Sequence, residues 1–251
     1  MTVDIMPGCE PFSAAGSPMG VLVLHGFTGN PGSLRELAER AAASGYTVEL
    51  PRLPGHGTNL DDMMTTSWSD WSSAALDAYD DLATRCQKVA VVGLSMGGTL
   101  TAFVAEQRPS VAGLVFINPL VMPPVIEMTD GLAQLIDAGI ETIDAIGSDI
   151  KKEGVTEASY PATPLRCTQS LFQALVGVQA GLSTIKAPSL LLSSREDHVV
   201  TTDNGDELEA KIAGDLERIW LEDSYHVATL DNDQELVESS TMAFLAKVLV
   251  K

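Results

Sequence analysis

The chain has 251 residues, 45% of them hydrophobic, and its 34 acidic and 15 basic side chains give a formal charge of −19. A chain of this length can bury a sizeable core within one domain. Its charge argues against nucleic acid as a partner, because phosphate binding needs a surplus of Lys and Arg. The same charge disfavours an anionic membrane surface. We interpret the acidity as a contribution to solubility.

No segment reaches the run of about 18 apolar residues that spans a membrane, so we expect no stable membrane insertion. Residues 1–20 lack the basic start and apolar stretch of a secretory signal, which predicts a cytoplasmic enzyme. The three cysteines, Cys9, Cys86 and Cys167, are widely spaced and predict reduced packing residues. Composition makes no prediction of the oligomeric state.

Short apolar runs alternate with longer stretches of helical spacing. Continuous rather than alternating hydrophobicity is typical of strands that are covered on both faces, as in a parallel sheet. The predicted strands are 21–24, 47–50, 89–92, 114–117, 190–192 and 216–221.

Helices are predicted between these strands. Ser33 and Glu36 have the spacing of a capping box, and an apolar stripe follows them. Asn232 and Glu235 make a similar opening for a C-terminal helix that runs towards Val250. Alternating strands and helices predict a doubly wound sheet with right-handed crossovers.

The alternation is interrupted between Pro119 and about Thr184. Helical spacing at 132–140 and a second candidate helix at 169–176 predict a small helical cap, inserted at about 120–180 into a single domain that spans 1–251. The alternative is one long irregular crossover, which is uncommon inside compact domains.

The strongest local motif is Gly93-Leu94-Ser95-Met96-Gly97, which fits G-x-S-x-G. It follows a predicted strand and precedes a predicted helix at 96–107. A sharp strand-to-helix turn strains its central residue and projects that side chain above the sheet. Ser95 is therefore the candidate nucleophile, at a helix N-terminus that favours developing negative charge.

A serine nucleophile needs a base to take its proton. Where the nucleophile occupies such a turn, the acid and then the histidine follow it in the chain. Only His198 and His226 lie after Ser95, and His198 cannot easily turn its ring towards its neighbour Asp197. His226 is the predicted base. The orienting carboxylate follows the strand at 190–194, with Asp197 favoured and Glu196 as its rival.

The first strand leads into the glycine-rich segment 25–30. Backbone N–H groups of such a loop can stabilise the oxyanion of a tetrahedral intermediate. We assign the two donors to Phe27 and to Met96, the residue after the nucleophile. An ordinary strand-to-helix turn is the alternative for this loop. Neither a Walker nor a dinucleotide motif is convincing, and no metal-ligand cluster is visible, so no cofactor or metal is expected.

At this point the sequence resembles bacterial monoacylglycerol lipases and related short-chain carboxylesterases of the α/β-hydrolase superfamily. The resemblance covers almost the whole chain. It rests on HGFTGNPGS at 25–33, PRLPGHGT at 51–58, GLSMGG at 93–98, GSDIKKEGV at 147–155, SREDHVV at 194–200 and SYHVATLDND at 224–233.

The resemblance implies the α/β-hydrolase fold, selects Asp197 over Glu196 and supports His226. It also implies that 146–157 belongs to a cap that lines an apolar acyl pocket. Ile146 would form part of the pocket wall, and Glu157 would contact a glycerol head group. An exposed cap carboxylate is the alternative for Glu157. The implied substrate is a small amphiphilic ester, since an apolar pocket gains about 0.8 kcal/mol per buried CH₂.

The expected reaction is hydrolysis of monoacylglycerols to glycerol and fatty acid through an acyl-enzyme. A broad short-chain carboxylesterase is the nearest alternative, and a thioesterase uses the same machinery. A non-catalytic scaffold has no physical need for Ser95, Asp197 and His226 together. Ser95 also disfavours a dehalogenase, which places a carboxylate at the same turn.

Overall fold

The computed structural model describes residues 3–145 and 147–250, and its centre is a seven-stranded sheet in the order β1-β3-β2-β4-β5-β8-β9. All neighbouring pairs are parallel except β1 and β3. The sheet is the doubly wound arrangement of an α/β-hydrolase fold, as predicted. The strands are β1 (Phe12–Ala14), β2 (Met19–Leu24), β3 (Thr47–Leu50), β4 (Lys88–Leu94), β5 (Gly113–Ile117), β8 (Ser189–Ser194) and β9 (Leu216–Leu221).

All six predicted strands are present, whereas β1 was not predicted. β1 is three residues long and none of its residues is fully buried, so it lacks the apolar run that marked the others. It adds an antiparallel edge beside β3.

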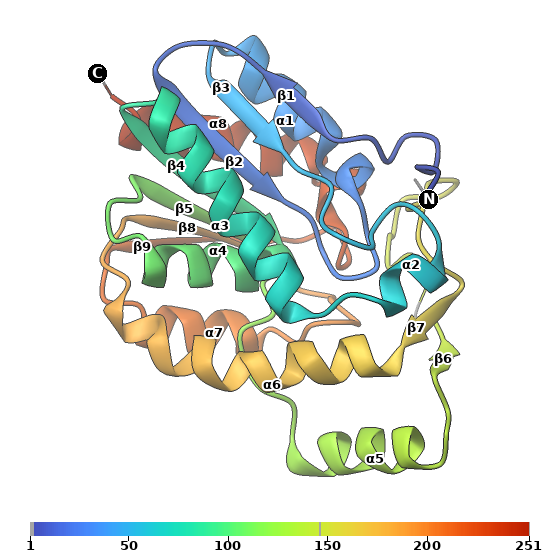
Figure 1. Ribbon diagram of the computed structural model, residues 1–251. Coiled ribbons are helices and arrows are strands. Elements are labelled where there is room, and N and C mark those ends of the chain that lie inside the picture. The colour runs from blue at the N-terminus through green and yellow to red at the C-terminus, as the bar shows by residue number, and fades with distance from the viewer. Residues whose placement is uncertain (1–2, 146, 251) are drawn as a thin grey trace.

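Helices cover both faces of the sheet (Figure 1). Alternate residues of each central strand point to opposite faces, so that Leu22 and Leu24 pack in one apolar cluster and Val21 and Val23 in the other. α1 and α8 cover one face, and α3, α4, α6 and α7 cover the other. The helix bounds are α1 (Arg35–Ala43), α2 (Leu60–Met64), α3 (Trp68–Arg85), α4 (Met96–Gln107), α6 (Leu165–Gly181), α7 (Asp203–Lys211) and α8 (Gln234–Val248).

Two predicted helix starts were wrong in their details. Asn30 caps a short 3₁₀ turn (Pro31–Leu34) that precedes α1, and Ser33 caps nothing because its hydroxyl instead donates to Glu157. α8 begins after Asp233 without a side-chain cap, so the capping box predicted at Asn232 does not form. In each case a residue of the predicted box has a tertiary partner instead: Ser33 bonds to Glu157, and Glu235 pairs with Arg40.

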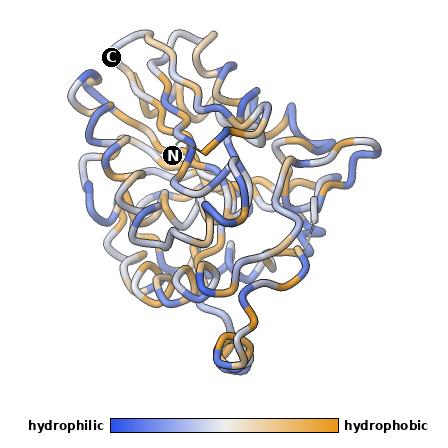
Figure 2. The backbone as a smooth tube through the Cα atoms, turned by 45° about the vertical axis from the view of Figure 1, so that its right-hand side comes forward, coloured by the Kyte–Doolittle hydropathy of each residue, from blue (hydrophilic) through white to orange (hydrophobic). Residues whose placement is uncertain are grey.

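The segment between β5 and α6 leaves the body of the molecule. It contains α5 (Ile126–Asp137) and two short antiparallel strands, β6 (Thr142–Asp144) and β7 (Ala162–Pro164). α5 stands apart from the sheet in two views (Figures 1 and 2). A small apolar cluster holds it against α6, formed by Leu132, Ile136 and Leu165 with Leu135 and Phe172 beside them.

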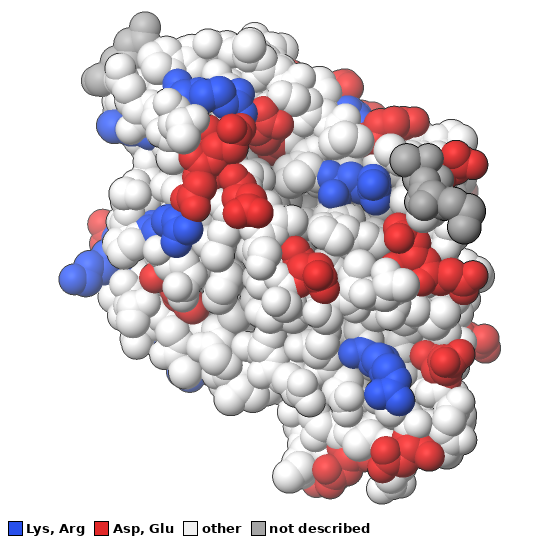
Figure 3. All heavy atoms as spheres, viewed as in Figure 1, with Lys and Arg blue, Asp and Glu red and all other residues white. Residues whose placement is uncertain are grey.

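Acidic side chains are spread over the face shown in Figure 3 and gather at its lower end, over α5, which carries Glu127, Asp130 and Asp137. Within residues 3–145 and 147–250, no helix is both long enough and apolar enough to cross a bilayer.

Candidate active site

Ser95 occupies the sharp turn between β4 and α4. Its backbone lies in the left-handed region, with φ 58° and ψ −119°, which is a strained conformation for a residue with a side chain. The turn requires its glycines: a Cβ on Gly93 would approach the Gly97 carbonyl oxygen to 2.0 Å, and one on Gly97 would approach that of Leu24 equally closely. The two glycines of the motif are therefore required because the strands and the helix pack too closely to leave room for a side chain at either position.

Hydrogen bonds fix the backbone of Ser95 on both sides. Its N–H donates to the Ile117 carbonyl (3.0 Å), and its own carbonyl accepts from Gly98 (2.8 Å) and Leu120 (3.2 Å). Ser95 itself is only partly buried. A rigid backbone thus presents a partly accessible hydroxyl at the N-terminus of α4, where the helix dipole favours negative charge.

The structure brings His226 and Asp197 together. The Nδ1 atom of His226 lies 2.7 Å from Oδ2 of Asp197, and the side chains are 8% and 2% exposed. Oδ1 of Asp197 accepts the N–H groups of Val199 (2.9 Å) and Val200 (2.7 Å). With its carboxylate held in this way, Asp197 can orient the imidazole as an Nδ1–H tautomer, which leaves Nε2 free to accept a proton.

The rival residues have other partners. Glu196 pairs with Lys151 at the surface (3.3 Å). His198 places its Nδ1 2.8 Å from Asp149, and this carboxylate raises the pKa of the exposed imidazole. Neither residue takes part in the contact between His226 and Asp197.

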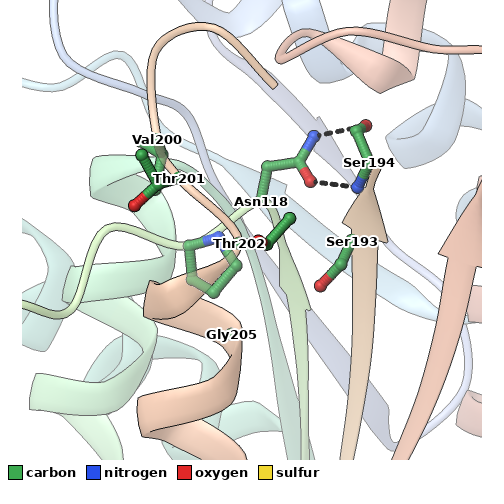
Figure 4. Close-up of a pocket in the computed structure, with 8 residues that line it drawn as sticks. Asn118, Ser193, Ser194, Val200, Thr201, Thr202 and Gly205 are labelled. Carbon is green, nitrogen blue, oxygen red and sulfur yellow. Dashed lines mark hydrogen bonds between the residues drawn. The ribbon is translucent and has the colours of Figure 1, made fainter. Parts of the chain in front are cut away.

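Asn118, directly after β5, connects the end of β8 to the loop that carries His226. Its amide donates to the His226 carbonyl (2.8 Å), and its side-chain oxygen accepts from the N–H of Ser194 (2.7 Å). Figure 4 shows the pair of hydrogen bonds between Asn118 and Ser194. Sequence reasoning missed Asn118, because an asparagine after a strand ordinarily indicates only a turn.

The loop after β2 lies against Ser95. A Cβ on Gly26 would come within 3.3 Å of the Ser95 Cβ, and Thr28 has a left-handed backbone with φ 59°. Among the residues that the structure describes, the N–H groups of Phe27 and Met96 donate to no protein acceptor. The predicted oxyanion donors are therefore available to a ligand.

Two buried histidines hold this loop. His25 lies 3.0 Å from the Gly26 carbonyl through Nδ1 and accepts the Leu53 N–H at Nε2 (3.1 Å), a pattern that fixes the Nδ1–H tautomer. His56 packs edge-on against both His25 and Phe27. Burial lowers the pKa of His25 to about 3 and that of His56 to about 4, so both rings are neutral near pH 7.

Glu157 faces the same loop. Its carboxylate accepts from Ser33, and a Cβ on Gly29 would come within 2.9 Å of it. Burial raises the pKa of Glu157, and the hydrogen bond from Ser33 only partly offsets this shift. Glu157 therefore lies near the catalytic candidates rather than on an exposed part of the cap. Ile146, the predicted pocket wall, lies outside the described residues.

An apolar cavity of about 300 Å³ lies between α5 and α6. Pro123 and Pro124 border it, and they follow Leu120, whose N–H donates to the Ser95 carbonyl. The remaining lining residues are Ile126, Thr129, Leu132, Gln169, Phe172, Gln173 and Val176. In the described part of the chain, no group of three or more His, Cys, Asp or Glu side chains could hold a metal ion.

Comparison with known proteins identifies the family of this chain. Residues 21–239 match the alpha/beta hydrolase family, and the chain belongs to that family. It is 44% identical to a thermostable monoacylglycerol lipase of Bacillus sp. (strain H-257), over 97% of this chain and 96% of that protein. It is 27% identical to a carboxylesterase of Bacillus subtilis (strain 168), over 95% and 97%.

Solved structures show the same relationship. A structure of the metagenome-derived lipolytic enzymes LipS and LipT superimposes with a TM-score of 0.93 at 44% identity, covering 97% of this chain and all of that one. The monoacylglycerol lipase of Paleococcus ferrophilus superimposes with a TM-score of 0.77 at 16% identity, covering 98% and 99%, and shows the shared fold.

Proposed function

We propose that the chain is a serine carboxylic ester hydrolase that cleaves monoacylglycerols to glycerol and fatty acid. The observation that carries the proposal is the contact of His226 with a buried, doubly hydrogen-bonded Asp197, on the same sheet edge as the strained Ser95 turn. The 44% identity to a monoacylglycerol lipase over nearly the whole chain supports the substrate class. The predicted cytoplasmic location stays a prediction.

In the proposed mechanism, Nε2 of His226 takes the Ser95 hydroxyl proton as the oxygen attacks the ester carbonyl. The N–H groups of Phe27 and Met96 stabilise the tetrahedral oxyanion. His226 then protonates the departing glycerol oxygen. Water attacks the acyl-enzyme with the same residue as base, which releases the fatty acid and restores Ser95.

The two ends of the substrate fit two chemically different surroundings. The cavity between α5 and α6 offers apolar side chains to the acyl chain, at about 0.8 kcal/mol per buried CH₂. Glu157, beside Ser33 and Gly29, offers a hydrogen-bond acceptor to the glycerol hydroxyls. The α5 side would therefore select the chain, and Glu157 would select the head group.

The test compares kcat/KM for a monoacylglycerol, the ethyl ester and the thioester of one acyl chain. We expect the glycerol ester to react fastest. Equal rates on glycerol and ethyl esters would instead indicate a broad carboxylesterase, the alternative that the Bacillus subtilis relative supports.

The head-group role is tested with Glu157→Ala, for which we expect kcat/KM to fall about 10-fold on the glycerol ester and little on the ethyl ester, because a lost hydrogen bond to substrate costs about 1.4 kcal/mol. Glu153→Ala is the matched control, since Glu153 is an exposed acid on the same segment. An equal loss on both esters would remove the head-group role of Glu157.

A further inference from the structure

Asp149, in the segment that returns from α5 towards β7, lies between the loops that carry Asp197 and His226. Its Oδ2 accepts the backbone N–H of His226 and that of His198, both at 3.1 Å. Its Oδ1 lies 2.8 Å from Nδ1 of the His198 ring. One carboxylate therefore binds the base itself and the residue next to the acid.

The position of Asp149 is fixed by its own surroundings. Its backbone carbonyl accepts the Val227 N–H (3.1 Å), and the neighbouring Ile150 packs against the core cluster that contains Val227. Its carboxylate is 12% exposed. An acceptor that is this constrained can hold the two loops at a set separation.

A second carboxylate extends the same connection. Asp231, which is 1% exposed, accepts the N–H groups of Lys151 (2.7 Å), Lys152 (2.8 Å) and Tyr225 (2.8 Å). It thereby joins the segment that follows Asp149 to the loop that precedes His226. The segment 149–152 is thus part of the catalytic framework rather than a free portion of the cap.

The backbone of His226 is held at both of its polar groups. Asn118 binds its carbonyl and Asp149 binds its N–H. Without Asp149, the His226 and His198 N–H groups would lose their acceptor, and only the contact between His226 and Asp197 itself would remain of the polar contacts described here between the two loops. The 2.7 Å contact between His226 and Asp197 depends on the distance between these loops.

We infer that Asp149 is a positioning residue that sets the contact between His226 and Asp197, an inference that rests on the proposed function. Because Asp149 acts by positioning His226, its loss must slow the turnover of every ester, whether the alcohol part is glycerol or not. A displacement of about 1 Å in a catalytic group can cost about 100-fold in rate.

The experiment measures kcat and KM on p-nitrophenyl butyrate for wild type, Asp149→Ala, Asp149→Asn and Asp144→Ala. Asn keeps one side-chain oxygen, which can accept both N–H groups that now bind Oδ2. Asp144 is an exposed acid of the same insertion and serves as the control. Turnover by wild type that disappears in Ser95→Ala tests the proposed function in the same assay, separately from the role of Asp149.

We expect Asp149→Ala to lower kcat by about 10- to 100-fold with KM within about 3-fold, and Asp149→Asn to recover most of the loss. The downfield proton resonance of the His226–Asp197 hydrogen bond should disappear in the Ala variant and persist in the Asn variant. If Asp149→Ala does not fold, Asp149→Ser replaces it with the same expectation, since its side chain is too short to bridge the loops. A kcat within 2-fold of wild type in the Ala or Ser variant, or an Asn variant as impaired as they are, would overturn the inference.

Discussion

The two halves of the segment between β5 and α6 are attached to the body in different ways. α5 is held by a small apolar cluster around Leu132, and it leaves Val125 and Ile126 65% and 69% exposed. The stretch 147–157 is instead tied by directional hydrogen bonds to the catalytic loops through Asp149 and Asp231. Apolar contacts are not directional, whereas hydrogen bonds to a shared carboxylate fix positions. If the proposed function holds, we expect the α5 half to adapt to the acyl chain and the other half to keep the contact between His226 and Asp197.

The largest expected effect is at Asp197, in the loop that Asp149 of the fixed half binds through the His198 N–H. In Asp197→Asn, the amide oxygen must stay with the Val199 and Val200 N–H groups, which turns the amide NH₂ towards Nδ1 of His226. That arrangement selects the tautomer whose Nε2 cannot accept a proton, so we expect kcat to fall by about 10³- to 10⁴-fold. Steady-state kinetics on a simple ester measures this loss. Glu196→Gln is the control, and a comparable loss there would transfer the role to Glu196.

The free energy of unfolding of Asp231→Ala tests the connection between the segment 151–152 and the loop that precedes His226. Removing the carboxylate leaves four N–H groups without their acceptor, those of Lys151, Lys152, Tyr225 and Asn232. We expect a loss of about 2–4 kcal/mol in the free energy of unfolding, measured by urea denaturation. Asn232→Ala, at an exposed neighbour, should stay within about 0.5 kcal/mol. Equal free energies of unfolding for the two variants would show that the hydrogen bonds of the Asp231 carboxylate do not stabilise the fold.

Leu132→Ala tests the adaptable half. Leu132 is 9% exposed and lines the cavity between α5 and α6, so its truncation enlarges that cavity and removes part of the apolar cluster. We expect kcat/KM to fall about 4- to 15-fold on long-chain esters, because about one to two buried CH₂ contacts are lost, with butyrate esters unaffected. Ile140→Ala, at an exposed apolar residue of the same insertion, is the control. An equal loss on short and long chains would contradict the division between the halves.

The last prediction concerns the packing of α4 against α6. A Cβ on Gly181 of α6 would lie 2.4 Å from the Glu106 carboxyl carbon, and one carboxyl oxygen of Glu106 is buried with no hydrogen-bond partner among the residues that the structure describes. Burial raises the pKa of Glu106 from 4.5 to about 7. Between these values the folded chain holds a proton on Glu106 that the unfolded chain has lost, so the contribution of Glu106 to stability falls as pH rises from about 4.5 to 7.

Because Glu106 is partly exposed, we expect this fall to be about 1–2 kcal/mol. Relative to wild type, Glu106→Gln should gain this amount of stability between pH 4.5 and pH 8, measured by urea denaturation of both proteins at pH 4.5, 6 and 8. His25 and His56 titrate in both proteins and cancel in this difference. A difference between variant and wild type that does not change with pH would contradict the role of Glu106.

The strands of the sheet and the candidate nucleophile could both be predicted because each leaves a local pattern in the sequence. Buried strands need continuous apolar runs, and the Ser95 turn needs glycines at two positions, so both leave local patterns. The roles of Asn118, Asp149 and Asp231 left none, since each binds backbone groups that are distant in the chain. Ser33 shows the same limit: its spacing indicated a cap, but folding brought Glu157 within reach of its hydroxyl. Hydrophobic periodicity indicates secondary structure, but it does not predict polar contacts between residues that are distant in the chain.

The central claim is that Ser95 forms the acyl-enzyme, and covalent labelling tests it most directly. A fluorophosphonate reacts with an activated serine, so intact-protein mass spectrometry followed by peptide mapping should find one adduct per chain, on Ser95. Labelling should be lost in Ser95→Ala and slowed in Asp197→Asn. Rapid labelling of Ser95→Ala, or an adduct on another residue, would contradict the account.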